Sequence, residues 1–317
     1  MRFVTPIFSL IAVLLAISIV TFVIASALPG DEAQIRVGKR DDLSTAQRNR
    51  LVAQTRKELG LDKPYPVQWL IWLEKVVQGD FGAQEGGGSV GKAVLTRIIP
   101  SLELTLVVLL VSLPTAAFLA VSAVRRGKRV VAKGLGQVLT VGFLFPQFWL
   151  AIVLVVVFAV ELGWLPASGY TSFGQNPGQH IEHLILPVLA LGIPTAALYY
   201  RYLRQSLQEV LQTQYIRTAR AKGVSESRVL YRHALPNALI PSLSVLGIQF
   251  GQLLGGVVVI ELILNWPGVG GLLMYSVNQQ DNSTLIAVVM AIAFAYVVVS
   301  TLIEIAYRII DPRIRRA

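Results

Sequence analysis

Residues 86–93, which read Gly-Gly-Gly-Ser-Val-Gly-Lys-Ala, come close to the phosphate-binding loop pattern GxxxxGK[ST]. In that loop, backbone N–H groups surround the phosphates and the last Ser or Thr hydroxyl binds Mg²⁺. Ala93 stands at this last position, so the metal ligand is missing. No strand is expected before the segment, although a phosphate-binding loop follows a strand. We therefore interpret these residues as a chance match and predict no nucleotide or other cofactor site on this chain.

The three histidines are the other candidates for chemistry. His180 and His183 stand three residues apart beside Glu182, and a metal site is conceivable there. No third ligand is in view, which favours ordinary polar roles over a metal site. The sequence also shows no Ser/His/Asp arrangement and no acid pair in a convincing catalytic context. We predict that the chain is not an enzyme, with no catalytic residue and no metal site.

Three glutamines interrupt otherwise apolar stretches, namely Gln147, Gln249 and Gln252. Because polar groups are costly in hydrocarbon, these side chains are candidates for the lining of a water-filled path. Hydrogen bonding between helices explains them equally well. The sequence leaves both interpretations open.

The composition predicts a membrane protein. The chain has 317 residues, of which 54% are hydrophobic and only 15% are charged, and a soluble domain needs more charge on its surface. Stretches of about 18 or more apolar residues are long enough to cross a bilayer as helices. Six candidate spans follow, at residues 3–27, 102–124, 135–160, 184–200, 238–264 and 284–307. The first is too long for a signal peptide and is interpreted as uncleaved, and the fourth contains Pro187 and Pro194, which predict a kinked or partly unwound span.

The distribution of Lys and Arg predicts the topology. Seven lie between the fourth and fifth spans, five between the second and third, and four after the sixth, whereas the other two short loops have none. Short loops rich in Lys and Arg stay in the cytoplasm, so both termini are predicted to be cytoplasmic. The long loop after the first span carries eleven basic residues and would lie outside, which is tolerable because long loops translocate largely regardless of charge. The net charge of +10 therefore reflects topology and not nucleic-acid binding.

Three regions follow from this topology. Residues 1–28 form the first transmembrane helix, residues 29–97 an extracytoplasmic loop with short helices, and residues 98–317 a five-helix core. Within the loop, helices are expected at 43–59 and at 67–77, and the second, with Trp69 and Trp72, is typical of a helix at the membrane surface. In the fifth span, Gly247, Gly251 and Gly255 form a stripe of small residues, which suits packing within the subunit and a subunit interface equally well.

A polar segment, residues 206–237, separates the fourth and fifth spans, and we call it the coupling segment. Helix-forming residues run to Lys222, Gly223 breaks the pattern, and Ser225 with Arg228 resembles a capping box at the start of a second helix. Pro236 is expected to end that second helix. Such a stiff unit would pass movement from a partner protein to the membrane. The alternative is a basic loop that binds anionic membrane lipid.

Several motifs resemble one known family. Arg217-Thr218-Ala219-Arg220-Ala221-Lys222-Gly223, followed by Leu235-Pro236, looks like the cytoplasmic "EAA" loop of ABC importer permeases, and YIRTARAKG…RHALPNALIP is similar to the dipeptide/oligopeptide/nickel permease branch in particular. Four further stretches agree, namely LGLDKPYPVQWLIWL with GDFG, HLILPVLALG, NWPGVGGLL and the terminal DPRIRRA. The chain departs from the family at Gln214, where Asp is common, and at Gln280, where a basic residue is frequent.

This resemblance implies a type I ABC importer permease fold, an all-α membrane protein of about six transmembrane helices with a long extracytoplasmic loop after the first. It implies a permease subunit of an ATP-driven importer in the bacterial plasma (inner) membrane. Its partners would be a second, non-identical permease subunit, two cytoplasmic ATPase subunits that bind the ATP, and an extracytoplasmic substrate-binding protein. The residues that would couple to the ATPase are Arg217, Thr218, Ala219, Arg220, Gly223, Leu235 and Pro236. Peptides are the expected cargo, nickel or another small solute is the alternative, and a self-contained channel or secondary transporter is the competing class.

Overall fold

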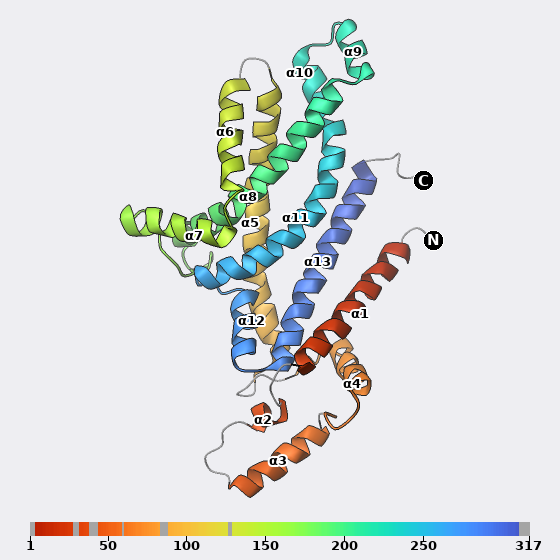
Figure 1. Ribbon diagram of the computed structural model, residues 1–317, viewed down its shortest axis with the longest axis vertical. Coiled ribbons are helices and arrows are strands. Elements are labelled where there is room, and N and C mark those ends of the chain that lie inside the picture. The colour runs from red at the N-terminus through yellow and green to blue at the C-terminus, as the bar shows by residue number, and fades with distance from the viewer. Residues whose placement is uncertain are drawn as a thin grey trace. The chain divides into compact units, whose positions relative to one another are not determined.

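The computed structural model describes residues 4–27, 32–37, 44–58, 60–82, 88–125 and 129–310 (Figure 1). The regular elements in these ranges are all helices, as the all-α prediction requires. They are α1 (Val4–Ala27), α2 (Glu32–Val37), α3 (Thr45–Glu58), α4 (Tyr65–Val77), α5 (Val90–Val124), α6 (Arg129–Gly142), α7 (Gln147–Leu154), the π-helix η1 (Val155–Glu161), α8 (Pro177–Leu211), α9 (Gln214–Ala221), α10 (Glu226–Arg228), the π-helix η2 (Val229–Ala234), α11 (Leu235–Ile263), α12 (Val269–Asn278) and α13 (Asn282–Ile310). Gly86 and Gly87 of the chance match and the terminal DPRIRRA lie outside the described residues.

Apolar helices occur at all six predicted spans. Four stretches of the described chain are long and apolar enough to cross a membrane, namely Val90–Val124, Pro177–Leu211, Val245–Ile263 and Asn282–Ile303. Helix α1 contributes a shorter apolar stretch, Ile11–Ile24. The fourth span is a continuous helix through Pro187 and Pro194, so the expectation that it is partly unwound is wrong. Most residues around the two prolines are buried, and packing against neighbouring helices holds the segment in helical form.

The third predicted span is a bent pair of helices. Gly134–Gly142 and Gln147–Glu161 together meet the criteria for one span, but they are bent by 106° at the break between them, so the span predicted at 135–160 is not one continuous helix. Pro146 stands just before α7 with φ −58° and ψ 140°, an extended conformation. Because proline has no N–H and restricts the residue before it, α6 cannot continue through this point.

The chain divides into two compact units. One comprises Met1–Ser101 with Pro267–Val297, and the other comprises Leu102–Trp266 with Val298–Ala317. In the first unit, Trp69 and Trp72 of α4 pack against Phe22 of α1 and Ile286 of α13. The predicted loop helices are confirmed as α3 and α4, and α3 has no buried residue.

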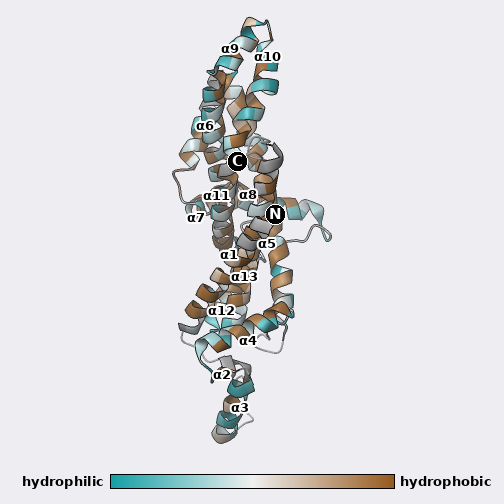
Figure 2. Cartoon of the chain, turned by 90° about the vertical axis from the view of Figure 1, so that its right-hand side faces the viewer, coloured by the Kyte–Doolittle hydropathy of each residue, from teal (hydrophilic) through white to brown (hydrophobic). Residues whose placement is uncertain are grey.

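The second unit contains two apolar clusters. One joins α5, α7, α8 and α11 around Leu104, Leu191 and Leu253. The other joins α5 and α8 to the coupling segment around Leu203, Leu207 and Ile216, so the coupling segment is part of the core of this unit. In Figure 2, the hydrophilic colours are prominent on α9 and α10, whereas the helices of the predicted spans are largely hydrophobic.

Candidate functional site

The coupling segment begins in the last turns of α8 and ends in the first turn of α11. Helix α9 lies next to α10 and η2, at one end of α8 and close to the start of α11 (Figure 1). Gly223 follows α9 with φ +77°, the left-handed region that glycine enters at no steric cost. The predicted turn at Gly223 is therefore confirmed. Ser225 occupies the N-cap position of α10, but its side chain makes no capping hydrogen bond, so the predicted capping box does not form.

Pro236 does not end a helix, and this expectation is wrong. The π-helix η2 passes directly into α11 at Leu235, and Pro236 lies in the first turn of α11. Proline is tolerated there because the first turn of an α-helix has N–H groups without a partner in any case. Helical structure therefore continues without a break from Glu226 to Ile263, so that a movement of α10 can pass directly to α11.

Buried apolar side chains fix the coupling segment to the longer helices. Ile216 of α9 and Val229 and Ala234 of η2 are fully buried in the cluster that contains Leu203 and Leu207 of α8. Ala219 and Leu235, two of the predicted coupling residues, are partly buried against the same cluster. Burying a side chain the size of Ile contributes about 1.5–3 kcal/mol. The segment is thus held firmly on its inner side.

The outer side of the coupling segment is polar, aromatic and exposed. Arg217 and Thr218 point to solvent, as do three further basic residues, Lys222, Arg228 and Arg232. Two rings accompany them, with Tyr215 45% and Tyr231 50% exposed. Arg and Tyr are the residues that protein interfaces favour. This outer side has the composition of a docking surface.

Arg220 has a partner within the segment. Its guanidinium donates to both carboxylate oxygens of Glu226, from Nε at 2.8 Å and from Nη2 at 3.1 Å, and Nη1 donates to the carbonyl of Leu211 at 3.5 Å. These bonds join α9 to α10 across the turn at Gly223 and to the end of α8. The sequence did not predict this arrangement, in which Arg220 bonds to other residues of the coupling segment and fixes its conformation.

The three candidate path glutamines lie on two neighbouring helices. Gln147 begins α7, and its side chain lies directly against Gly256 of α11. Gly256 is one helical turn from Gln252 and two turns from Gln249, on the same face of α11. Gln249 is buried with 6% exposure, whereas Gln252 is exposed. The structure thus brings Gln147 to the face of α11 that carries the other two.

A second polar cluster surrounds His180, near the start of α8. His180 is 2% exposed, and its Nε2 lies 3.0 Å from Glu103 Oε1 of α5. Its Nδ1 lies 2.7 Å from the carbonyl oxygen of Thr171. Both ring nitrogens of His180 therefore lie within hydrogen-bond distance of an oxygen atom.

Aromatic rings enclose His180. Tyr170 and Phe173 meet its ring edge-on, each with 5.7 Å between the ring centroids, and Trp266 lies at 6.1 Å. Burial raises the pKa of the Tyr170 phenol, and the charge of Glu103 raises it further. The cluster ties the loop at 163–176 to α5 and α8. Sequence reasoning treated His180 as an ordinary polar residue, because nothing in the spacing connects it with Glu103.

The fold and these two sites together define a class of protein. It is a helical membrane protein with several apolar spans, which presents a stiff, basic, exposed helix pair between two of them. In the part of the chain that the structure describes, no three His, Cys, Asp or Glu side chains are grouped so that they could hold a metal ion.

Comparison with known proteins identifies the family. Residues 93–316 match the model of the binding-protein-dependent transport system inner membrane component, and residues 1–120 match the model of the N-terminal part of such components. The chain belongs to this family. It is therefore a multi-pass permease subunit of the inner membrane, in a transport system that works with a binding protein and an ATPase.

Curated relatives match over almost their full length. A probable peptide ABC transporter permease protein of Sinorhizobium fredii is 37% identical over 97% of this chain and 96% of its own length. A glutathione transport system permease protein of Salmonella paratyphi A and an oligopeptide transport system permease protein of Bacillus subtilis are each 36% identical over 96% of both chains. Among solved structures, the MetNI methionine ABC transporter has a TM-score of 0.49 at 18% identity, covering 69% of this chain and 94% of that chain.

Proposed function

We propose that this chain is a permease subunit of an ATP-driven importer for peptides. The observation that carries the proposal is the coupling segment, which is held on its inner side by Ile216, Val229 and Ala234 and presents exposed Arg and Tyr on its outer side. An ATPase that docks on the outer side would move the inner side with it. The peptide cargo is supported by the names of the relatives, which include peptide, oligopeptide and glutathione permeases.

Movement of the ATPase would reach the membrane through α11. Because helical structure is continuous from Glu226 to Ile263, a displacement of α10 and η2 would move the adjoining end of α11 with them. Helix α8, in contrast, is separated from α9 by a break at Gln212 and Thr213. Arg217, Thr218, Ala219, Arg220, Gly223, Leu235 and Pro236 form the coupling unit in this proposal. Arg217 and Thr218 are exposed and contact the ATPase, whereas Ala219 and Leu235, which are partly buried, transmit the movement inward.

A second, non-identical permease subunit completes the translocation path in this proposal. One face of α11 is available for it, since a side-chain carbon added at Gly247 or Gly255 would meet no described atom within 4 Å. Small residues at this spacing suit the close approach of a helix from a partner subunit. Gln147, Gln249 and Gln252 then line the half of the path that this chain provides. The distribution of Lys and Arg supports a topology in which both termini and the coupling segment are cytoplasmic.

The proposal is tested by separating ATP hydrolysis from uptake. The full importer, with its ATPases and its binding protein, is reconstituted in liposomes, and peptide uptake and ATP hydrolysis are measured together. In Gly223→Val, a β-branched side chain at φ +77° disfavours the turn between α9 and α10 by about 1–3 kcal/mol. Uptake is expected to fall about tenfold or more, since 1.4 kcal/mol corresponds to a factor of ten, while ATP hydrolysis continues.

Two controls accompany this variant. Gly79→Val places the same side chain at φ +83° with no atom within 4 Å, outside the coupling segment, and is expected to keep uptake. Gly223→Asn keeps most of the uptake, because Asn tolerates the left-handed region. Undiminished uptake in Gly223→Val would contradict the proposal. Peptide flux through this chain without any ATPase would instead favour a self-contained channel or secondary transporter, and competition by Ni²⁺ but not by peptides would favour a nickel importer.

A further inference from the structure

A pocket in the first unit lies at the ends of two apolar helices. It encloses ≈ 550 Å³ including its opening to solvent, and its lining comes from α1, α4, α13 and the loops that flank α4. Phe22 lies in the last two turns of α1, and Ser283 is the second residue of α13. Both helices have the composition of membrane spans. We therefore expect the pocket to lie at the level where the hydrocarbon of a bilayer meets its headgroups.

Helix α4 has the character of a helix that lies in this boundary layer. Its inward face carries Trp69 and Trp72, and Trp69 Nε1 donates to Ser18 Oγ of α1 at 3.2 Å. Its other face leaves Leu70 55% and Val77 81% exposed, although both are apolar. A helix with apolar residues on an exposed face and Trp beside it is typical of a membrane interface. Helix α4 thus brings the pocket next to lipid.

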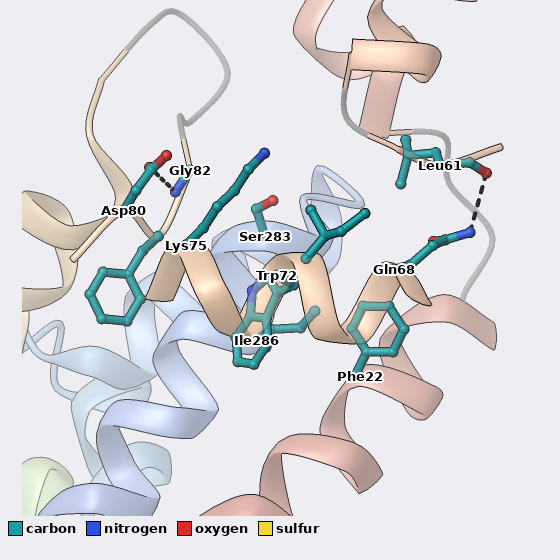
Figure 3. Close-up of a pocket in the computed structure, with 11 residues that line it drawn as sticks. Phe22, Leu61, Gln68, Trp72, Lys75, Asp80, Gly82, Ser283 and Ile286 are labelled. Carbon is teal, nitrogen blue, oxygen red and sulfur yellow. Dashed lines mark hydrogen bonds between the residues drawn. The ribbon is translucent and has the colours of Figure 1, made fainter. Parts of the chain in front are cut away.

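The pocket has two opposite charges on an aromatic floor. Figure 3 shows the charged ends of Lys75 and Asp80 on one side of the pocket, with the rings of Phe22 and Trp72 on the other. The Asp80 amide donates to the carbonyl of Lys75 at 2.9 Å, which keeps the two residues together. Asp80 Oδ1 accepts from the Gly82 amide at 2.9 Å and leaves Oδ2 for a ligand. Within the described parts of the chain, the Lys75 ammonium has no hydrogen-bond or ion-pair partner.

We propose that this pocket binds the zwitterionic headgroup of a phosphatidylethanolamine-type phospholipid. Lys75 pairs with the phosphate, and Asp80 accepts hydrogen bonds from the primary ammonium of the headgroup. The acyl chains lie along α1, where Val20, Val23 and Ile24 are 57%, 58% and 56% exposed. The charges select this lipid, because a choline headgroup has no N–H to donate to Asp80 and a glycerol headgroup brings no cation.

Native mass spectrometry of the purified full importer, exchanged into nanodiscs of defined lipid, tests the proposal. The wild type is expected to retain phosphatidylethanolamine over phosphatidylcholine of the same acyl chains. Lys75→Gln reduces retention of both lipids about tenfold, the size expected for the loss of one charge-assisted hydrogen bond. Asp80→Asn reduces retention of phosphatidylethanolamine by a similar factor and leaves phosphatidylcholine unchanged.

Two matched variants serve as controls. Lys57→Gln on α3 removes an exposed positive charge, as a match for Lys75→Gln, and Glu74→Gln on α4 removes an exposed negative charge, as a match for Asp80→Asn. Neither residue lines the pocket, and both variants are expected to retain lipid as the wild type does. Equal retention of the two lipids by the wild type would overturn the proposal, as would unchanged retention in Lys75→Gln. Displacement of the bound lipid by a short peptide, at concentrations that support uptake, would make the pocket a peptide site and would also overturn it.

Discussion

Arg220 and Glu226 hold the two short helices of the coupling segment together. Their side chains meet through two parallel hydrogen bonds, Nε to Oε1 at 2.8 Å and Nη2 to Oε2 at 3.1 Å, across the turn at Gly223. A paired geometry of this kind fixes direction as well as distance. Glycine allows the turn, and the ion pair limits which turn forms. Helices α9 and α10 are thus expected to move as one body when a partner protein displaces either of them.

Breaking this ion pair is expected to weaken coupling more than it weakens the fold. The side chains of Arg220 and Glu226 are 40% and 55% exposed, and exposed ion pairs contribute only about 0.2–1 kcal/mol to stability. Arg220→Ala and Glu226→Ala should therefore unfold at nearly the wild-type temperature, while ATP-driven uptake falls in both. Uptake and thermal unfolding of the reconstituted importer check this, and exchange of the two residues for one another should restore part of the uptake.

The matched control for this pair is Glu58→Ala. It breaks an exposed side-chain hydrogen bond from Gln54 to Glu58 on α3, outside the coupling segment, and should leave uptake unchanged. If Arg220→Ala abolishes uptake and Glu226→Ala does not, Arg220 acts by contacting the ATPase directly, and the role of the ion pair is wrong.

The spans and the turn at Gly223 were predictable because each depends on a local property. Long apolar stretches reveal membrane helices by composition alone. Gly223 interrupts a helical pattern at a place where another residue would have been strained. The role of Pro236 was predicted wrongly for a related reason. Because proline has no backbone N–H, it marks a boundary of an α-helix, but proline alone does not tell whether the helix begins or ends there. The bend before α7 also had a visible signal in Pro146, which an average over a hydrophobic stretch conceals.

The contacts that give the sites their geometry were not predictable. Glu103 and His180 belong to different helices, and only the packing of α5 against the start of α8 brings them within 3.0 Å. Ile216 looks like one apolar residue in a basic segment, yet it is fully buried. Gln147 meets Gly256 only because the bend at Pro146 turns α7 toward α11. Each of these contacts depends on tertiary packing, which the spacing of residues along one chain does not encode.

The cluster around His180 predicts a pH-dependent signal from Tyr170. Burial and the charge of Glu103 raise the pKa of its phenol above the usual 10.0, so the folded protein holds this proton more tightly than the unfolded chain does. The associated stability is fully present below pH 10.0 and is lost as the pH rises through the pKa of the folded state. Tyr170→Phe should therefore lose less stability above this pH than the wild type loses.

The ultraviolet absorbance of phenolate measures this proton directly. The difference between the titrations of the wild type and Tyr170→Phe gives the midpoint for Tyr170. Glu103→Gln should lower that midpoint, because it removes the negative charge that disfavours the phenolate. An unchanged midpoint in Glu103→Gln would show that the two side chains do not interact, and the ring cluster would then need another explanation.

Gly136 and Gly134 of α6 are expected to respond in opposite ways to the same substitution. A side-chain carbon added at Gly136 would overlap the ring of Tyr200, whereas one added at Gly134 would meet nothing within 4 Å. Tyr200 is 2% exposed and belongs to the apolar cluster that holds Ile216, so its ring has little room to move. Gly136→Ala should destabilise the protein by about 1–3 kcal/mol through overpacking, and Gly134→Ala should stabilise it by about 0.5–1 kcal/mol through lower backbone entropy of the unfolded chain.

Thermal unfolding of both variants in the same detergent measures the difference. Adding Tyr200→Leu to Gly136→Ala should recover part of the loss, and a Gly136→Ala protein as stable as Gly134→Ala would refute the contact between α6 and Tyr200.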